Sequence, residues 1–378
     1  MSVVVIGGGL AGLNAALTLQ EAGVEVDLYE ASDEVGGRVK SEYIDGYIFD
    51  HGFQLINEGY SELKRLKLID EIEFLPFSRS IDVVTPMGVS TIGDPSSNPL
   101  QALRSPLGSL KEKLSFIKYI SSRSKPGESL EGEMLRAGMG DLYLNVVKPF
   151  LRGVFLAELD TVDAAYGKEI ISTFRVGKSG LPSAGAGVLS QALAARIEKI
   201  HLNHRVTTLD EFAGKHIIVA TDAQTADNLL GVPSQTQWVS STTWYHALDK
   251  GAVDSSSLRV SSVETDIINS AAISLTYSQF APADKVLFTT TALTQLSEDQ
   301  VQHDLEKYWG VTGFEYLRRY EISHSLPWVK PGENKSLATS KVHEGIYRAG
   351  DYTSLGSQNA ALLSGRFAAT ELLSQLKR

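Results

Sequence analysis

The sequence predicts an α/β protein with two domains, one built on a three-layer parallel sheet and the other an inserted α+β domain. The chain opens with a strand, a glycine turn, a helix and a second strand, all within its first 30 residues. Buried-strand patterns return far along the chain, at residues 215–222 and 346–351. A length of 378 residues also exceeds what one core ordinarily supports.

Bulk composition excludes several classes of protein. With 43% hydrophobic and 21% charged residues, the composition is that of a soluble globular chain. The net charge of −10 argues against a nucleic-acid partner. The lack of cysteine excludes disulfides and thiolate metal sites and fits a reducing compartment. Neither a leader peptide nor an 18-residue apolar stretch is visible, so we expect a cytoplasmic protein without a transmembrane segment.

The opening turn carries a nucleotide-binding pattern. Gly7, Gly9 and Gly12 fit the spacing G-x-G-x-x-G. The first glycine permits the tight turn, the second lets a pyrophosphate approach the backbone, and the third lets the helix pack on the strand. Leu10 and Ala11 begin that helix, and its positive N-terminus faces the phosphates. We therefore expect a Rossmann-like dinucleotide-binding domain.

An acidic residue and a second glycine loop extend this pattern. Glu30 ends the second strand, where a carboxylate can accept hydrogen bonds from ribose hydroxyls, and Ala31 follows it. Gly36 and Gly37 precede Arg38, so backbone can lie against a phosphate while the guanidinium neutralises it. The alternative is an ordinary glycine turn with a surface arginine.

These motifs resemble the flavin-containing amine oxidase superfamily, which includes monoamine and polyamine oxidases, protoporphyrinogen oxidase and phytoene desaturase-like enzymes. The resemblance rests on residues 5–13, 30–39, 50–52, 345–351 and 364–366. It implies that the dinucleotide is FAD. It also implies an FAD-binding domain made of residues 1–75, 180–233 and 341–378, and a substrate domain made of residues 76–179 and 234–340.

The resemblance implies a set of residues that contact FAD. The segment after residue 51 lies beside the cofactor, a short strand opening at Val206 brackets the adenine, and Asp351 bonds the ribityl or pyrophosphate region. The N-terminus of the last helix points at the flavin ring and stabilises negative charge on it. The full set is Gly7, Gly9, Leu10, Ala11, Gly12, Glu30, Ala31, Gly36, Gly37, Arg38, Gly52, Phe53, Gln54, Val206, Ala220, Thr221, Gly350, Asp351, Ser357, Gln358 and Asn359.

The remaining segments predict a substrate domain. We expect a hairpin at 81–92, strands at 242–248, 258–263, 271–277 and 285–290, and a helix at 298–309. A basic amphipathic helix at 109–122 could contact an anionic membrane, although such a helix more often covers a core. The candidate pocket residues are His51, Trp244, His246, Tyr277, Trp328 and Tyr352.

No catalytic side chain stands out, and we expect no metal site. His201 and His204 form an isolated pair. Ser357 occupies the place where a tyrosine of the substrate cage usually sits in the amine oxidases. The sequence therefore favours a desaturase-like or protoporphyrinogen-oxidase-like enzyme that removes hydride from a C–C or C–N bond of a hydrophobic or amine-bearing small molecule. The alternatives are an amine oxidase that releases peroxide, and a non-catalytic FAD-binding partner protein.

Overall fold

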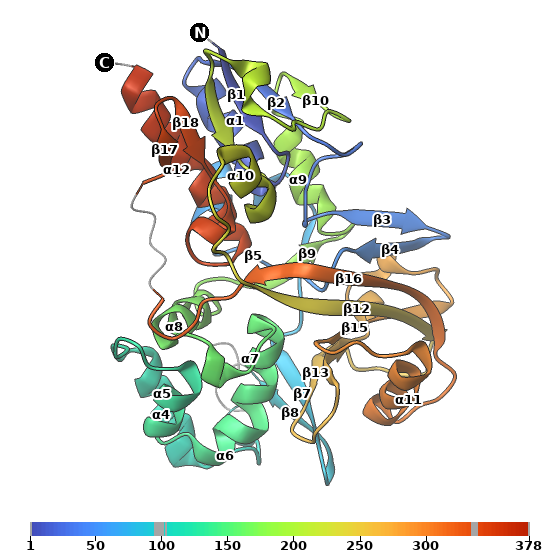
Figure 1. Cartoon of the computed structure of the whole chain (residues 1–378). Helices are drawn as coiled ribbons and strands as arrows, with labels where there is room; N and C mark the ends of the chain where they lie inside the picture. The colour runs from blue at the N-terminus through green and yellow to red at the C-terminus, as the bar shows by residue number, and fades with distance from the viewer. Residues whose placement is uncertain (1, 94–101, 103, 334–338, 377–378) are drawn as a thin grey trace.

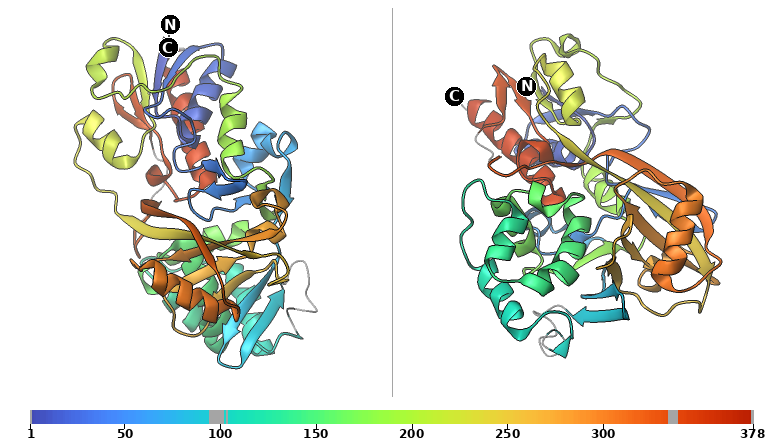
Figure 2. Two further views of the ribbon diagram at one scale, coloured as in Figure 1. Left: turned by 90° about the vertical axis from the view of Figure 1, so that its right-hand side faces the viewer. Right: turned by 60° about the horizontal axis from the view of Figure 1, so that its bottom comes forward.

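The computed structural model describes residues 2–93, 102, 104–333 and 339–376. It is a mixed α/β protein with two large sheets, one near the chain termini and one at the opposite end (Figure 1). Segments from both ends of the sequence lie together in the first sheet. Figure 2 shows the same division from two further directions.

The first sheet has six strands and is mostly parallel. Its order is β10 (Ile200–His201), β2 (Glu25–Tyr29), β1 (Ser2–Ile6), β11 (His216–Val219), β18 (Ile346–Arg348) and β17 (Lys341–His343). Only the β17–β18 pair is antiparallel. Residues 3–6 are buried on both faces, which is why this strand is a continuous apolar run.

Helices cover both faces of this sheet. Val3 and Val5 face a core shared with α1 (Leu10–Glu21), α9 (Gly187–Ala194) and α12 (Gln358–Leu376). Val4 and Ile6 face α10 (Ala223–Leu230) on the other side. A Cβ added to Gly365 of α12 would lie 1.9 Å from the Ala11 carbonyl oxygen, so α12 packs directly on α1.

The second sheet has seven strands and is mostly antiparallel. Its order is β16 (Glu315–Pro327), β12 (Trp238–Asp249), β15 (Lys285–Ala292), β14 (Ile267–Ala271), β13 (Leu258–Ser261), β7 (Ser80–Thr85) and β8 (Gly88–Gly93). Only β13 and β7 pair in parallel. One face packs on α11 (Glu298–Trp309).

Helices gather beside the other face of this sheet (Figure 1). They are α4 (Leu110–Ile120), α5 (Leu130–Arg136), α6 (Gly140–Leu142), α7 (Lys148–Phe155) and α8 (Ala164–Thr173). The chain also forms two small sheets. One pairs β3 (Ser41–Ile44) with β4 (Tyr47–Asp50), and the other has the order β5 (Ile56–Asn57), β9 (Ser179–Pro182) and β6 (Phe74–Pro76). The helix α2 (Ser61–Leu66) lies between β5 and β6 in the sequence. Short 3₁₀ turns occupy Leu68–Asp70, Leu159–Thr161, Leu209–Phe212, Ile273–Leu275, Ser278–Phe280 and Asp351–Thr353, and a π-helical turn occupies Tyr143–Val147. Among the described residues, no helix is both long and apolar enough to cross a membrane.

Three expected elements differ from the structure. Val206 opens no strand; it is a single buried side chain in the core on the α10 side. The strand expected at 271–277 is wrong: β14 ends at Ala271, and two 3₁₀ turns follow, each burying one apolar side chain, Ile273 and Phe280. The sequence of residues 188–200 also predicts one helix, but α9 ends at Ala194 and the chain then enters β10.

Candidate cofactor site

The opening glycine turn leaves backbone uncovered at the start of α1. Gly7 has a φ of +107°, and a Cβ on Gly12 would lie 1.9 Å from the Gly7 carbonyl oxygen, so both positions require glycine. A Cβ on Gly9 would meet nothing within 4 Å. Gly9 is the N-cap of α1, and no side chain caps it. The positive end of α1 is therefore available to an anionic ligand.

The second glycine loop lies against the first. The Gly36 amide donates a 2.9 Å hydrogen bond to the Gly8 carbonyl. Gly37 has a φ of +59°, and a Cβ there would lie 3.4 Å from the Gly9 Cα. The two loops thus meet backbone to backbone. Gly36, with a φ of +122°, and Gly37 both adopt a left-handed conformation, which explains why the sequence has glycine at these two positions.

Glu30 lies beside the glycine turn and is held from two sides. Its carboxylate accepts a hydrogen bond from the Gly8 amide at 2.7 Å, and others from the amide and hydroxyl of Ser32 at 2.9 and 2.7 Å. The Glu30 amide donates to the His201 carbonyl, and the His204 amide donates to the Glu30 carbonyl. This pairing fixes the loop around Ala31 next to the segment that contains Val206.

His201 and His204 each have a different carboxylate partner. The His201 ring lies 3.0 Å from Asp27, and the His204 ring lies 2.7 Å from Glu211. Both rings pack against Tyr29. No group of three potential metal ligands occurs among the residues that the structure describes.

Arg38 joins the glycine loops to distant parts of the chain. Its guanidinium donates to Asp351 at 2.6 Å and to the Ser325 carbonyl at 2.9 Å, and it lies 5.3 Å from the ring centroid of Trp238. Asp351 is buried, whereas the Arg38 side chain is 38% exposed. The arginine expected at a phosphate and the acid expected at the ribityl or pyrophosphate region are therefore close neighbours.

Two glutamines extend this cluster to the start of α12. The Gln54 side chain donates to the carbonyls of Arg38 and His51, both at 2.7 Å. Gln358 donates to Gln54 at 3.3 Å, while its own buried Oε1 has no partner among the described atoms. Ser357 caps α12, since its hydroxyl accepts from the Ala360 amide at 3.1 Å.

Asn359 faces α2 instead of this cluster. Its side-chain oxygen accepts from the Glu62 amide at 3.1 Å. Glu62 is buried and accepts hydrogen bonds from Arg366 at 2.8 and 2.9 Å and from Arg65 at 3.0 Å. Burial alone would raise the pKa of Glu62, but the hydrogen bonds from the two arginines outweigh it and lower that pKa. This network ties α12 to α2.

The remaining expected contacts border the glycine turn or lie near it. The Ala220 amide donates to the Ile6 carbonyl at 2.7 Å, and a Cβ on Gly7 would lie within 3 Å of Ala220 and Thr221. The Gly350 amide donates to Ser364 of α12 at 2.9 Å. Gly52 has a φ of +98° and packs beside Ile322 of β16.

These features fit an extended dinucleotide. Bare backbone at the start of α1 suits a diphosphate, and Glu30 suits a ribose. Arg38 supplies a cation, and Asp351 supplies a buried acid. The unpartnered buried oxygen of Gln358 leaves a hydrogen-bond acceptor for a ligand donor.

The structure brings only some of the expected pocket residues together. His51 packs on Tyr320 with ring centroids 4.4 Å apart and lies 2.8 Å from Glu42, which also pairs with Arg318. Tyr277 connects to Phe53, since both rings pack on Phe77. His51 and Tyr277 thus lie on the side of the seven-stranded sheet that faces β4.

Trp244 and His246 lie on the opposite face of that sheet. His246 packs on Phe314 in the cluster that contains α11, and Trp244 packs beside His246. Burial lowers the pKa of His246 to about 4, so this histidine is neutral near pH 7. Tyr245, between them, points toward β4 and donates a 2.8 Å hydrogen bond to the Asp50 carbonyl.

Trp328 and Tyr352 also lie away from His51. The Trp328 indole donates to the Thr161 carbonyl at 3.1 Å. The Tyr352 hydroxyl donates to the Ala349 carbonyl, and its ring packs in the core on the α10 side. Neither residue shares a contact with the His51 cluster among the described interactions.

Sequence reasoning missed Glu42, Tyr245, Tyr320 and Trp238. All of residues 241–248 in β12 are buried, so hydrophobicity could not show which face points toward the cofactor side. The alternation of side chains along a strand could have identified Tyr245, because it places the neighbours of Trp244 on the opposite face of the sheet.

Comparisons with known proteins identify the class. A family described as flavin containing amine oxidoreductase matches residues 10–373. Putrescine oxidase from Kocuria rosea is 46% identical over 77 residues, which is 20% of this chain and 16% of that protein. 4,4'-Diaponeurosporene oxygenase from Staphylococcus aureus is 40% identical over 58 residues, 15% of this chain and 12% of that protein. These sequence matches therefore span only a small part of each relative's length.

A solved structure matches over nearly its whole length. It is a provisionally assigned protoporphyrinogen oxidase from Exiguobacterium sp. 255-15, with a TM-score of 0.74 and 19% identity, covering 100% of this chain and 99% of that one. At this identity the likeness concerns the fold. The family match covers most of the chain, so the protein belongs to the flavin-containing amine oxidoreductases. This membership confirms the expected flavin oxidoreductase and FAD as its cofactor.

Proposed function

We propose that this protein uses FAD to remove two electrons, as hydride, from a C–C or C–N bond of a hydrophobic or amine-bearing small molecule, in the manner of a desaturase or protoporphyrinogen oxidase. The observation that carries the proposal is the aromatic wall on the β4 side of the seven-stranded sheet. Its members pack edge to face or stacked, and they are Phe49, Phe53, Phe77, Tyr245 and Tyr277.

The proposed FAD-binding domain consists of residues 1–75, 180–233 and 341–378, and the proposed substrate domain of residues 76–179 and 234–340. The six-stranded sheet draws all its strands from the first set. We assign the diphosphate to the glycine turn and Arg38, the ribose to Glu30, and the ring end to the cluster of Gln54, Asp351 and Gln358. Asn359 supports the site from behind through α2.

The flavin supplies the two-electron chemistry, so the protein must bind, orient and shield the substrate. The phenols of the aromatic wall are poor bases. Burial, with Asp50 nearby, raises the pKa of Tyr245 well above its ordinary value, and burial also raises that of Tyr277. Both phenols therefore stay protonated at neutral pH. The five residues of the wall offer no side-chain proton acceptor, and His51, which packs on Tyr320, is held by Glu42 at 2.8 Å, so the wall suits hydride removal from carbon.

Anaerobic reduction of the bound flavin tests the proposal. The purified protein should be yellow, and its absorption should bleach on addition of a partly saturated cyclic or polyene compound. A panel of primary and secondary amines, with peroxide measured after oxygen is admitted, separates the amine oxidase alternative. Bleaching by amines alone would overturn the desaturase-like proposal. A flavin that no compound in either panel reduces would instead favour a non-catalytic FAD-binding protein.

A further inference from the structure

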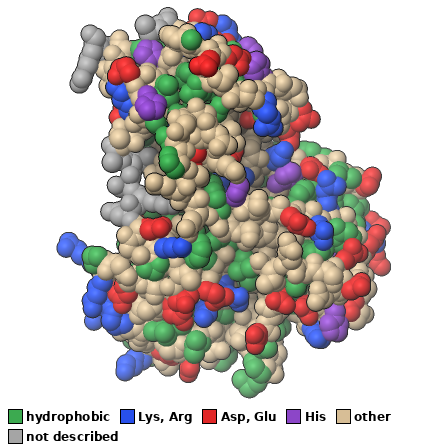
Figure 3. All heavy atoms as spheres, viewed as in Figure 1, with side chains coloured by type: hydrophobic (Ala, Val, Ile, Leu, Met, Phe, Trp, Pro, Cys, Tyr) green, Lys and Arg blue, Asp and Glu red, His purple; other side chains and the backbone are tan. Residues whose placement is uncertain are grey.

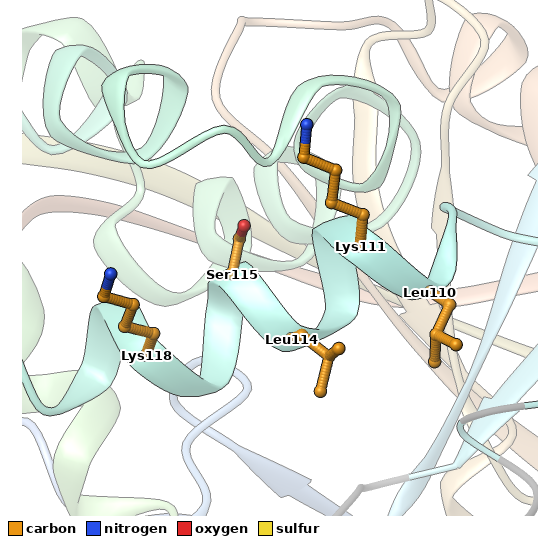
Figure 4. Close-up of a pocket in the computed structure, with 5 residues that line it drawn as sticks. All are labelled: Leu110, Lys111, Leu114, Ser115 and Lys118. Atoms are coloured by element: carbon orange, nitrogen blue, oxygen red, sulfur yellow. The ribbon is translucent and has the colours of Figure 1, made fainter.

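We infer that the exposed face of α4 docks on an anionic lipid surface. Leu110, Leu114 and Ile117 follow helical spacing along this face and are each more than half exposed. Lys111 and Lys118 lie along the adjacent side of the same helix (Figure 4). We call these five residues the α4 docking face.

The docking face is part of an ordered helix. A capping box between Ser109 and Glu112 starts α4, and Glu112 also accepts a hydrogen bond from the Asp141 amide at 2.6 Å. The opposite side of the helix is buried, with Tyr119 only 2% exposed. Because that side holds the helix on the protein, the leucines are presented to solvent in a fixed arrangement.

The apolar residues border a shallow depression of about 410 Å³ lined by Leu110, Lys111, Leu114, Ser115 and Lys118. The tip of the β7–β8 hairpin, with Met87 98% exposed, lies at the same end of the molecule (Figures 1 and 2). Apolar side chains exposed from two elements at one end are typical of an interaction surface.

The charges favour an anionic partner. Residues 104–125 contain six Lys or Arg and one Glu, in a chain whose net charge is −10; Lys113 is buried and the other five cations are exposed. Figure 3 shows Lys and Arg side chains along the lower left edge, where Figure 1 places α4 and α5. Neither Lys111 nor Lys118 forms an ion pair with another described residue. Screening confines charge effects to about 8 Å at physiological ionic strength, so this local positive charge outweighs the acidic remainder of the chain at contact.

A second copy of the chain fits this face less well than a bilayer does. Pairing two α4 docking faces would bring the Lys111 and Lys118 side chains of both copies around one narrow apolar stripe. An anionic bilayer accepts the leucines at the boundary of its acyl chains, while its headgroups neutralise the lysines. This inference is independent of the flavin chemistry proposed above.

Vesicle co-sedimentation tests the inference. With the flavin-loaded full chain, we expect binding to vesicles that mix phosphatidylglycerol and phosphatidylcholine to be about tenfold stronger than to phosphatidylcholine alone. L114E should weaken binding by at least about tenfold, because the variant puts a charge in the apolar stripe. K111Q/K118Q should remove the preference for phosphatidylglycerol while the apolar contact remains.

L202E is the matched control, because Leu202 is also an exposed leucine but follows β10 at the other end of the molecule. It should bind as the wild type does. Unchanged flavin absorption and melting temperature show that each variant is folded. The inference is overturned if the wild type stays in the supernatant with phosphatidylglycerol, or if L114E binds normally. A concentration-dependent dimer in sedimentation velocity that L114E abolishes would also overturn it, in favour of a second copy.

Discussion

Replacing Glu62 with glutamine should destabilise the protein measurably, because Glu62 ties α12 to α2. The substitution keeps the side chain's shape but removes the charge that accepts hydrogen bonds from Arg366 and Arg65. Removing one partner of a buried ion pair costs about 3–5 kcal/mol. The two arginines are 35% and 32% exposed, so water can solvate them once the carboxylate is lost. We therefore expect a loss of about 2–3 kcal/mol, below the fully buried range.

The expected change in melting temperature follows from chain length. An unfolding entropy of about 2.1 cal/mol/K per residue gives about 0.8 kcal/mol/K for this chain, so E62Q should melt about 3–4 °C lower at pH 7. The pKa of Glu62 is lowered in the folded state from 4.5. Its stabilisation is therefore fully present above pH 4.5 and is lost as the pH falls through the folded pKa. The difference in melting temperature between E62Q and the wild type should therefore become smaller at acid pH.

Thermal denaturation followed by circular dichroism at several pH values measures both effects. E344Q is the control, because Glu344 is 86% exposed and pairs only with Lys341 on the surface. E344Q should have the same melting temperature as the wild type. If E62Q melts within about 1 °C of the wild type at pH 7, or if the difference in melting temperature widens as the pH falls, Glu62 does not stabilise the α2–α12 contact.

Two further predictions concern the proposed cofactor site, and a third concerns Asp50 at the end of β4. G12A places a Cβ 1.9 Å from the Gly7 carbonyl oxygen, so the purified variant should lose its flavin absorption; normal flavin content would contradict the tight helix–strand packing. R38K keeps the charge, but an ammonium cannot replace a guanidinium that bonds Asp351 and a carbonyl together, so titration of the apoprotein should show FAD affinity about tenfold weaker. Equal affinity would remove Arg38 from the proposed site. Burial raises the pKa of Asp50 from 3.8 to about 6 in the folded state, so the wild type should lose up to about 3 kcal/mol as the pH rises through 6, while D50N should not. If the melting temperatures of the wild type and D50N change with pH by the same amount, the prediction for Asp50 is refuted.

The strand–helix–strand unit over residues 2–29 could be predicted because its signals are local. The turn at Gly7 to Gly12 and the acid at Glu30 lie within one strand–helix–strand unit, and each has a steric or charge requirement that few residue types meet. The helix expected at 298–309 appears with those bounds, since Ser297 and Gln300 form a capping box and Gly310 ends it. Such determinants operate within a few residues of each other.

The substrate side could not be predicted to the same depth. Trp244 and Tyr245 are both buried, and only the packing of α11 against one face decides which of them faces the cofactor side. Asn359 marks the start of α12, but its direction depends on α2, almost 300 positions earlier in the chain. Glu62 is a charged residue that the amphipathic pattern places in solvent, yet Arg366, about 300 positions away, and Arg65, one helical turn away, hold it in the interior. These outcomes depend on tertiary partners, which a local pattern does not contain.

The packing of α12 on α1 has a consequence for biosynthesis. The glycine turn is synthesised long before its partners, because Gly365 packs on the Ala11 carbonyl and β18 joins the parallel sheet only from residue 346 onward. A nascent chain therefore carries an unfinished form of the proposed cofactor cradle until residues 346–365 have left the ribosome. Because these contacts join segments more than 300 residues apart, assembly of the cradle should be slow, and deletion of β18 or α12 should damage the distant glycine turn.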